Sequence, residues 1–190
     1  MIEHWISRAE RASTELPNGK RLFQAYAALL KFVWYNDYIG ACHDTSAILY
    51  IILSEMGFSP VLMIGEVKAA IGIFDHSWVE LDGKVYDVAV GFPGEDGCHV
   101  GPSIFASLNL HTGEPTDLEF GVRSQNGLDE VGRMVANSNL DQYSKLQPEG
   151  KTIWDFASMI GAACGLKIRK AHLKIKYGKI VRTLVESGAR

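Results

Sequence analysis

The chain has 190 residues, of which 47% are hydrophobic and 22% are charged, and this length and composition suit one folded domain. Its formal net charge of −3 at pH 7 provides no basic field that would gather nucleic acid or anionic lipid, so we expect neither as a partner. Three cysteines are too few for a disulfide framework, and this favours a reducing compartment.

No segment of the sequence is typical of export or of membrane insertion. The first residues carry charge early and lead into no long apolar run, so we expect no signal peptide. The most apolar stretch, residues 47–53, is far shorter than the roughly 20 residues that a spanning helix needs. We therefore expect a cytoplasmic protein that has no contact with a membrane.

One stretch near the C-terminus is locally basic. Its basic residues are Lys167, Arg169, Lys170, Lys174, Lys176, Lys179 and Arg182. Apolar residues such as Leu173 and Ile180 lie between them, which favours a solvated face over a binding patch.

Hydrophobic spacing predicts three helices at the start of the chain. Residues 3–15, 20–35 and 42–56 carry apolar side chains at spacings of three and four. Gly57 follows the third segment at the position where a left-handed residue usually ends a helix.

After Pro60 the pattern changes to that of strands. Residues 61–67 and 71–81 form two apolar runs, and Asp82-Gly83 is a strong two-residue turn that leads into a third strand over 84–90. We take 40–90 as the core of a single domain spanning 1–190 and 91–150 as a loop-rich insertion that borders the site, with a hint of helix over 127–146. Residues 151–163 predict a helix, and 165–186 fit either a hairpin or a helix.

Cys42 has the surroundings of a reactive thiol. A thiol attacks a carbonyl carbon as its thiolate, which a helix N-terminus and a nearby imidazolium both stabilise. Cys42 follows Gly40-Ala41 and opens the third predicted helix, so its sulfur is expected near free backbone N–H groups. Asp44, in the first turn, is expected to cap or steady this helix end.

The predicted hairpin supplies a histidine and a carboxylate. A turn at Asp82-Gly83 places His76 near the register of residue 88 or 89, so Asp87 lies on the neighbouring strand within a residue or two of it. A carboxylate in that place fixes the tautomer of the imidazole and stabilises its charged form. Whether both side chains leave the same face stays open, because a one-residue slip reverses the face.

These pieces together resemble the core of the transglutaminase-like (papain-like) superfamily of cysteine peptidases and acyl-transfer enzymes. The residues that carry the resemblance are 40–44 (GACHD), 57–60 (GFSP), 75–80 (DHSWVE) and 83–87 (GKVYD). They follow the order of that superfamily, in which a cysteine opens a helix, a histidine begins a strand and an aspartate follows a glycine turn. The resemblance implies an α+β fold in which the helix bearing the cysteine packs on an antiparallel sheet bearing the histidine and the aspartate.

Carried over to this sequence, the resemblance implies that Cys42 is the nucleophile, His76 the general base and acid, and Asp87 its orienter. The Cys42 backbone N–H and one upstream side chain would form the oxyanion hole. Asn36 is the preferred donor among four candidates that precede the cysteine, the others being Gln24, Trp34 and Tyr35. Glu80 shares the strand face of His76 and is expected to support the site.

Other residues of these types fit simpler roles. Cys164 is expected to pack in the core, and Cys98, beside His99 in a Gly-rich loop, is the rival reactive thiol. His43 should point away from Cys42, since successive helical residues turn by about 100°. Trp78 and Tyr86 are expected in the core or on the hairpin face. Asp75, the rival orienter, should face away from His76, because adjacent strand residues point to opposite faces.

The function expected is hydrolysis of an amide bond through a thioester acyl-enzyme, by a cysteine peptidase or amidase that acts on a peptide or protein and needs no cofactor. The size and the lack of accessory domains favour a bacterial or phage enzyme. Three alternatives stay open: transfer of the acyl group to an amine, a catalytically inactive peptide-binding module, and a metal site made of Cys42, His43, His76 and Asp87.

Overall fold

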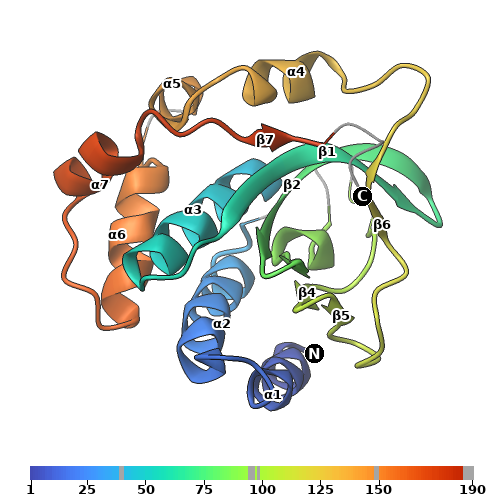
Figure 1. Cartoon of the computed structure of the whole chain (residues 1–190), viewed down its shortest axis with the longest axis horizontal. Coiled ribbons are helices and arrows are strands. Elements are labelled where there is room, and N and C mark those ends of the chain that lie inside the picture. The colour runs from blue at the N-terminus through green and yellow to red at the C-terminus, as the bar shows by residue number, and fades with distance from the viewer. Residues whose placement is uncertain (39–40, 94–96, 98, 148–149, 186–190) are drawn as a thin grey trace.

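Three segments at the start of the chain form helices, as their apolar spacing predicts. The computed structural model describes residues 1–38, 41–93, 97, 99–147 and 150–185. Its first helices are α1 (Ile2–Ser13), α2 (Gly19–Tyr35) and α3 (Cys42–Glu55), and Figure 1 shows α1 and α2 packed together at one end of the molecule. Gly57 follows α3 with a φ of 83°, which confirms the left-handed residue predicted there.

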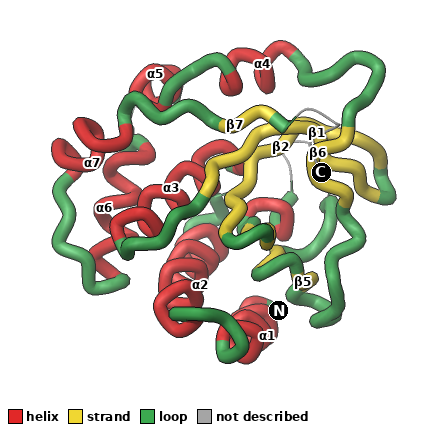
Figure 2. The backbone as a smooth tube through the Cα atoms, viewed as in Figure 1, coloured by secondary structure: helices red, strands yellow, loops and turns green. Residues whose placement is uncertain are grey.

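A sheet of five strands follows α3. The strands are β1 (Val61–Ala69), β2 (Gly72–Leu81), β3 (Lys84–Tyr86), β6 (Glu119–Val122) and β7 (Thr183–Leu184). The order β3-β2-β1-β6 is antiparallel throughout, and β7 adds to β1 in the parallel direction. The protein is therefore an α+β protein, with the strands gathered on one side of α3 and most helices on the other (Figure 2).

The turn between β2 and β3 sets the register on which the site depends. Asp82 and Gly83 both have positive φ, 51° and 72°, as a tight two-residue hairpin turn requires, and Leu81 pairs with Lys84. The third strand ends at Tyr86, however, and the prediction that it runs to Val90 is wrong. The chain leaves the sheet because the Asp87 carboxylate accepts the Val90 N–H (3.2 Å) and starts the 3-10 turn η1 (Ala89–Gly91).

Alternating residues of the sheet pack into two cores. Val79, Leu81 and Tyr86 belong to the large core around α3, which also receives residues from α1 and α2. Trp78 and Val85 belong to a smaller core on the opposite face. Both Trp78 and Tyr86 are buried, which confirms their predicted place in the core. Helix α3 is thus held between α2 and α6 (Ile153–Ala163) on one side and β2 on the other.

Residues 91–150 contain several short elements. These are β4 (Ile104–Phe105), β5 (Leu108–Asn109), β6, α4 (Glu130–Ala136) and α5 (Leu140–Leu146). The helix predicted over 127–146 is in fact two helices, because Asp129 and Asn139 each accept a backbone N–H and start a new one. Since β6 joins β1, this segment is part of the main sheet and not only an insertion.

The C-terminal elements are α6 (Ile153–Ala163), α7 (Lys170–Tyr177) and β7. The helix predicted over 151–163 is confirmed, and the segment after it forms a helix and a short strand, so the hairpin alternative is wrong. No helix in the described part of the chain is both long and apolar enough to cross a membrane.

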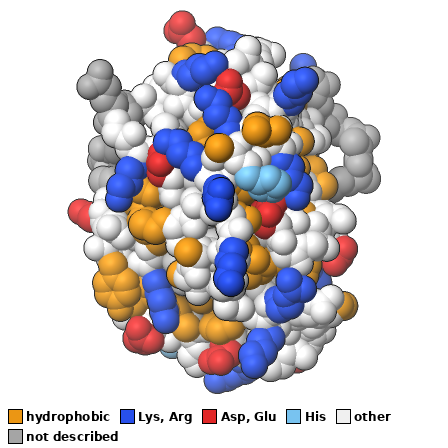
Figure 3. Space-filling view, turned by 90° about the vertical axis from the view of Figure 1, so that its left-hand side faces the viewer, with side chains coloured by type: hydrophobic (Ala, Val, Ile, Leu, Met, Phe, Trp, Pro, Cys, Tyr) orange, Lys and Arg blue, Asp and Glu red, His pale blue; other side chains and the backbone are white. Residues whose placement is uncertain are grey.

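The basic stretch around α7 is largely a charge-balanced surface. Lys170 pairs with Asp155 (2.8 Å) and Lys176 with Glu55 (2.7 Å). On the face shown in Figure 3, basic side chains alternate with acidic and hydrophobic ones and form no continuous patch. This agrees with the predicted solvated face, with one exception, because Arg182 is buried.

Replacing Gly83 tests the hairpin. A Cβ at this residue meets no atom within 4 Å, so Gly83→Ala acts only through the positive φ and is expected to lower the free energy of unfolding by about 1 kcal/mol. Gly101→Ala is the matched control, because its φ is not positive and its Cβ would meet only Leu118 Cδ1, at 3.9 Å. Urea unfolding measures both variants, and equal stabilities would contradict the expected strain.

Candidate active site

Cys42 is the first residue of α3, as the sequence predicts. The helix begins with the Thr45 N–H donating to the Ala41 carbonyl (2.9 Å), so the backbone N–H groups of the first turn are free of helical partners. The thiol is only partly exposed. A partial positive charge at a helix start favours a thiolate there.

His76 and Asp87 are joined by a short hydrogen bond. His76 Nε2 lies 2.6 Å from Asp87 Oδ2, and the residues are only 5% and 3% exposed. Val79 pairs with Tyr86 as the predicted register requires, but the chain leaves the sheet before residue 88 or 89 could pair with His76. The two side chains nevertheless meet, although the sequence left their relative faces open.

Asp87 is fixed at every polar atom. Its backbone exchanges two hydrogen bonds with Ile104 (2.9 and 2.7 Å), and its carbonyl oxygen also accepts the Tyr26 hydroxyl (3.1 Å). Its second carboxylate oxygen accepts the Val90 N–H (3.2 Å). The backbone bonds hold the residue in place, and the carboxylate cannot turn away from His76 without breaking its bond to Val90.

The charges around Cys42 and His76 favour transfer of the thiol proton to the imidazole. Burial alone would raise the pKa of the Cys42 thiol, but attraction to and hydrogen bonding with His43 and His76 outweigh it and hold that pKa well below its usual range. Burial would lower the pKa of His76, but Asp87 and Cys42 together raise it to about 10. Since Nε2 is bonded to Asp87, Nδ1 is the ring nitrogen left for Cys42. Both shifts favour a thiolate and an imidazolium over a neutral thiol and imidazole.

His43 also acts on Cys42, so the prediction that it points away is wrong. Its Nδ1 lies 2.8 Å from the Ser77 hydroxyl on β2, which holds the ring at the edge of the sheet. From there its charge and its hydrogen bond lower the pKa of the Cys42 thiol. The turn of 100° per residue describes only the directions of the Cα–Cβ bonds of His43 and Cys42. The imidazole extends further than Cβ, and in the place where Ser77 holds it the ring still reaches the sulfur.

Asp44 supports the site differently from the prediction. Among the described residues no side chain caps α3 by a hydrogen bond, so the capping alternative is wrong, whereas Asp44 does lie in the first turn, where a negative charge steadies a helix. Instead, the buried Asp44 carboxylate accepts the Tyr38 and Tyr143 hydroxyls and the Gln147 amide (2.7 Å). Sequence reasoning missed Tyr143 and Gln147, since they lie 99 and 103 positions away and carry no local signal.

Two further predicted residues lie elsewhere. Asn36 is exposed at the end of α2, and its amide donates to the Phe32 carbonyl (2.8 Å), so it is directed along its own helix. Glu80 accepts the Trp78 indole N–H (3.0 Å) and lies four residues along β2 from His76, about 13 Å at strand spacing. Neither is brought to Cys42, because the strand and helix geometry direct them elsewhere.

Asp75 does not compete with Asp87. Its carboxylate accepts the Asp129 N–H (2.7 Å), at the start of α4. The Asp75 carboxylate is thus bonded to α4 and not to the imidazole, although Asp75 and His76 both line one cavity. Asp87 is therefore the carboxylate that orients the imidazole.

Of the cysteines that the structure describes, Cys164 does not belong to this group. Cys164 is buried in the large core, where burial raises the pKa of its thiol, which confirms the predicted packing role. Cys98 lies outside the described residues. Among the residues that the structure does describe, no three His, Cys, Asp or Glu side chains are arranged to hold a metal ion, so the four proposed metal ligands do not form a ligand set.

A cavity of about 190 Å³ opens beside Cys42 and His76. The rest of its lining is mostly apolar and includes Phe74, Val90, Phe92, Pro93 and Val100, with Asp75 as its acidic residue. Asp87 is not part of the lining, since it lies behind the imidazole. A ligand in this cavity would meet Cys42, His76 and Asp75 but not Asp87.

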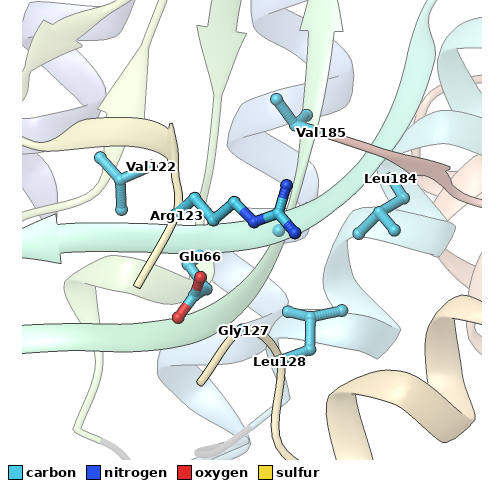
Figure 4. A pocket seen from close by; sticks show the side chains of 8 residues that line it. Glu66, Val122, Arg123, Gly127, Leu128, Leu184 and Val185 are labelled. Carbon is cyan, nitrogen blue, oxygen red and sulfur yellow. The ribbon is translucent and has the colours of Figure 1, made fainter. Parts of the chain in front are cut away.

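A second pocket lies between β1, β6 and β7. In Figure 4 the Arg123 side chain reaches across it toward Leu184 and Val185, with Glu66 below. The Glu66 carboxylate accepts the Ser124 N–H (2.8 Å) and hydroxyl (2.5 Å). None of Cys42, His76 and Asp87 lines this pocket, so it is separate from the candidate site.

Comparison of the chain with protein-family models, with curated proteins and with solved structures found no match. What the protein does must therefore be inferred from the side chains around Cys42. Those side chains are a thiol whose pKa is lowered, two imidazoles and a buried carboxylate, beside a mostly apolar cavity.

Removing the thiolate is expected to change the titration of His76. Because the Cys42 charge helps to raise the pKa of His76, Cys42→Ala should lower that pKa from about 10. Titration of the imidazole by NMR measures the shift. Cys164→Ala is the matched control, since the Cys164 thiol donates to the Gln24 carbonyl and not to a histidine. An unchanged pKa in Cys42→Ala would mean that the two groups do not form an ion pair.

Asn36 offers a test of its exclusion. Asn36→Ala is expected to leave kcat/KM for the expected amide substrate unchanged within about twofold, because the exposed amide donates to a carbonyl of its own helix. Steady-state kinetics measures this ratio. A loss of about 10²-fold or more in kcat/KM would return Asn36 to the oxyanion hole.

Proposed function

We propose that the chain is a cysteine-nucleophile enzyme that hydrolyses amide bonds through a thioester. The observation that carries this proposal is the buried 2.6 Å bond between His76 and Asp87, with the imidazole facing a thiol at a helix start. A thiolate, a charged imidazole and an orienting carboxylate are the groups that acyl transfer through a cysteine requires.

The first half of the reaction forms the acyl-enzyme. The Cys42 thiolate attacks the amide carbonyl carbon, and the carbonyl oxygen becomes an oxyanion. As this intermediate collapses, the C–N bond breaks and the His76 imidazolium gives its proton to the leaving amine. A thioester and a neutral imidazole remain, and Asp87 keeps the ring in place.

The second half of the reaction restores the enzyme. The neutral His76 takes a proton from water as the water oxygen attacks the thioester carbonyl. The carboxylic acid product leaves, the C–S bond breaks, and Cys42 is again a thiolate beside an imidazolium. Water as the acceptor makes the enzyme a peptidase or amidase, whereas an amine acceptor would make it a transglutaminase-type acyltransferase.

The backbone at the start of α3 is the best candidate for the oxyanion hole. The Cys42 N–H lies at the free end of the helix, where N–H groups have no helical partner and the helix dipole favours negative charge. The direction of the Asn36 amide removes the support for a role of that residue. The hole proposed is therefore formed by the backbone.

The arrangement of elements also supports membership of the transglutaminase-like (papain-like) superfamily. The thiol opens α3, which packs on β2, while the imidazole lies on β2 and the carboxylate follows β3. This is the order of elements that the resemblance over residues 40–90 implies. We therefore propose that the chain belongs to this superfamily.

The cavity supports a substrate with an apolar side chain next to the scissile bond. Its volume of about 190 Å³ and its lining by Phe74, Phe92 and Val100 suit an aliphatic or aromatic group of moderate size. We therefore propose a peptide or protein substrate that places such a residue beside Cys42.

Activity-based labelling tests the proposal. A library of peptides bearing an electrophile and differing in the apolar residue should label Cys42, as mapped by mass spectrometry, and should not label Cys164, which is buried. A labelled peptide then gives an amide substrate, whose product masses distinguish water from an added amine as acceptor. Peptide binding without turnover by the wild type would instead favour the inactive binding module.

Three substitutions separate the roles of the triad. Cys42→Ala and His76→Ala are each expected to lower kcat/KM by at least about 10⁴-fold, because they remove the nucleophile and the proton carrier. Asp87→Asn keeps a hydrogen-bonding side chain and should cost less, on the order of 10²-fold. Cys164→Ala is the control that retains activity, and wild-type turnover from Cys42→Ala would end the assignment.

A further inference from the structure

Arg182 is the one residue of the C-terminal basic stretch that the structure buries. It immediately precedes β7 and is 3% exposed. Its Nη2 donates to the carbonyl oxygen of His43 (2.8 Å), the residue after Cys42, and its guanidinium carbon lies 4.5 Å from the centre of the Tyr143 ring. The side chain therefore reaches the first turn of α3 from the far end of the sequence.

This arginine has fewer partners than a buried cation needs. Its Nε and Nη1 atoms are buried without a hydrogen-bond partner, and within the described ranges no carboxylate lies within ion-pair distance of it. Burial lowers the pKa of Arg182, yet an arginine stays charged in proteins. A cation in this position needs nearby negative charge to offset the loss of water.

The negative charge that faces Arg182 comes from the candidate site. The groups that act on its charge are Tyr143, Cys42 and Asp44. The guanidinium lies over the Tyr143 ring, and the Tyr143 hydroxyl donates to Asp44. The side chain of Tyr143 therefore separates the Asp44 carboxylate from the cation. The third group is Cys42, and a thiolate there and the Arg182 guanidinium would stabilise each other equally.

We propose that Arg182 is a positioning residue for Cys42, which holds the first turn of α3 by its bond to the His43 carbonyl and stabilises the thiolate by its buried charge. The inference rests on the proposed function only in giving that thiolate a use. It adds a cation from the C-terminal segment to the two imidazoles that already face the sulfur. The site is then completed by a segment that the core motif over 40–90 does not contain.

A merely structural arginine would behave differently from this one. If Arg182 only filled space between α3 and Tyr143, a neutral side chain of similar length would leave the acidity of the thiol unchanged. If it acts by charge, lysine should retain the effect and methionine should lose it. Charge and packing are thus separated by two substitutions at one position.

The test measures how the rate of Cys42 alkylation by iodoacetamide depends on pH in the wild type and in Arg182→Met, Arg182→Gln and Arg182→Lys. The two neutral variants are expected to raise the pH midpoint by about one unit, which is about a tenfold slower reaction at pH values below the midpoint. Arg182→Lys should stay near the wild type. Circular dichroism and urea unfolding establish that each variant is folded, and mass spectrometry confirms that Cys42 is the residue alkylated.

Each outcome decides between the proposals. A wild-type midpoint near 8.5, the value of an ordinary thiol, would overturn the proposed function itself. A low wild-type midpoint that the neutral variants leave unchanged would overturn the role of Arg182 alone. The same holds if Arg182→Lys shifts the midpoint as far as Arg182→Met does, or if neither neutral variant folds, since Arg182 would then serve the fold and not the thiol.

Discussion

The hydrogen bond between His76 and Asp87 is the contact on which the rest of the site depends. It forms between two buried side chains, where the low dielectric strengthens the attraction of a carboxylate for a charged imidazole. A ring held by its Nε2 can present only Nδ1 to Cys42, so one bond fixes both the orientation of the ring and the nitrogen that handles the proton. The turn at Asp82-Gly83 and the bridge between Asp87 and Ile104 fix the backbone on both sides of Asp87 and so hold that bond in place.

Around this bond the structure distributes charge so that no anion is left alone. Asp87 faces His76, while the buried Asp44 is held by two hydroxyls and an amide and needs no cation of its own. The sulfur of Cys42 is the group that His43 and His76 both attract in its ionised form. Three hydrogen-bond donors stabilise the Asp44 carboxylate, and they permit a second buried carboxylate two residues from the thiol.

The sequence predicts those parts of the molecule that local patterns determine. Apolar spacing identified α1, α2, α3 and α6, and the turn residues Asp82 and Gly83 gave the register that brings His76 to Asp87. It could not show that β3 ends at Tyr86, because the Asp87 side chain competes with the sheet for the backbone. It also missed Ser77, Tyr143 and Arg182 as neighbours of the site, since each is defined by a contact between distant segments and not by any pattern within one.

The long reach of Arg182 has a consequence for how the molecule folds. The hydrogen bond between Arg182 and the His43 carbonyl joins residues 139 positions apart, and β7 pairs in parallel with β1 beside it. Contacts of such high sequence separation carry a large loop-closure entropy and form late. The α3 helix and the β2-β3 hairpin are local and can assemble early, whereas the last contact at the head of α3 must wait for the C-terminal strand to dock. A newly made chain would therefore form α3 and the β2-β3 hairpin before Arg182 reaches the first turn of α3 beside Cys42.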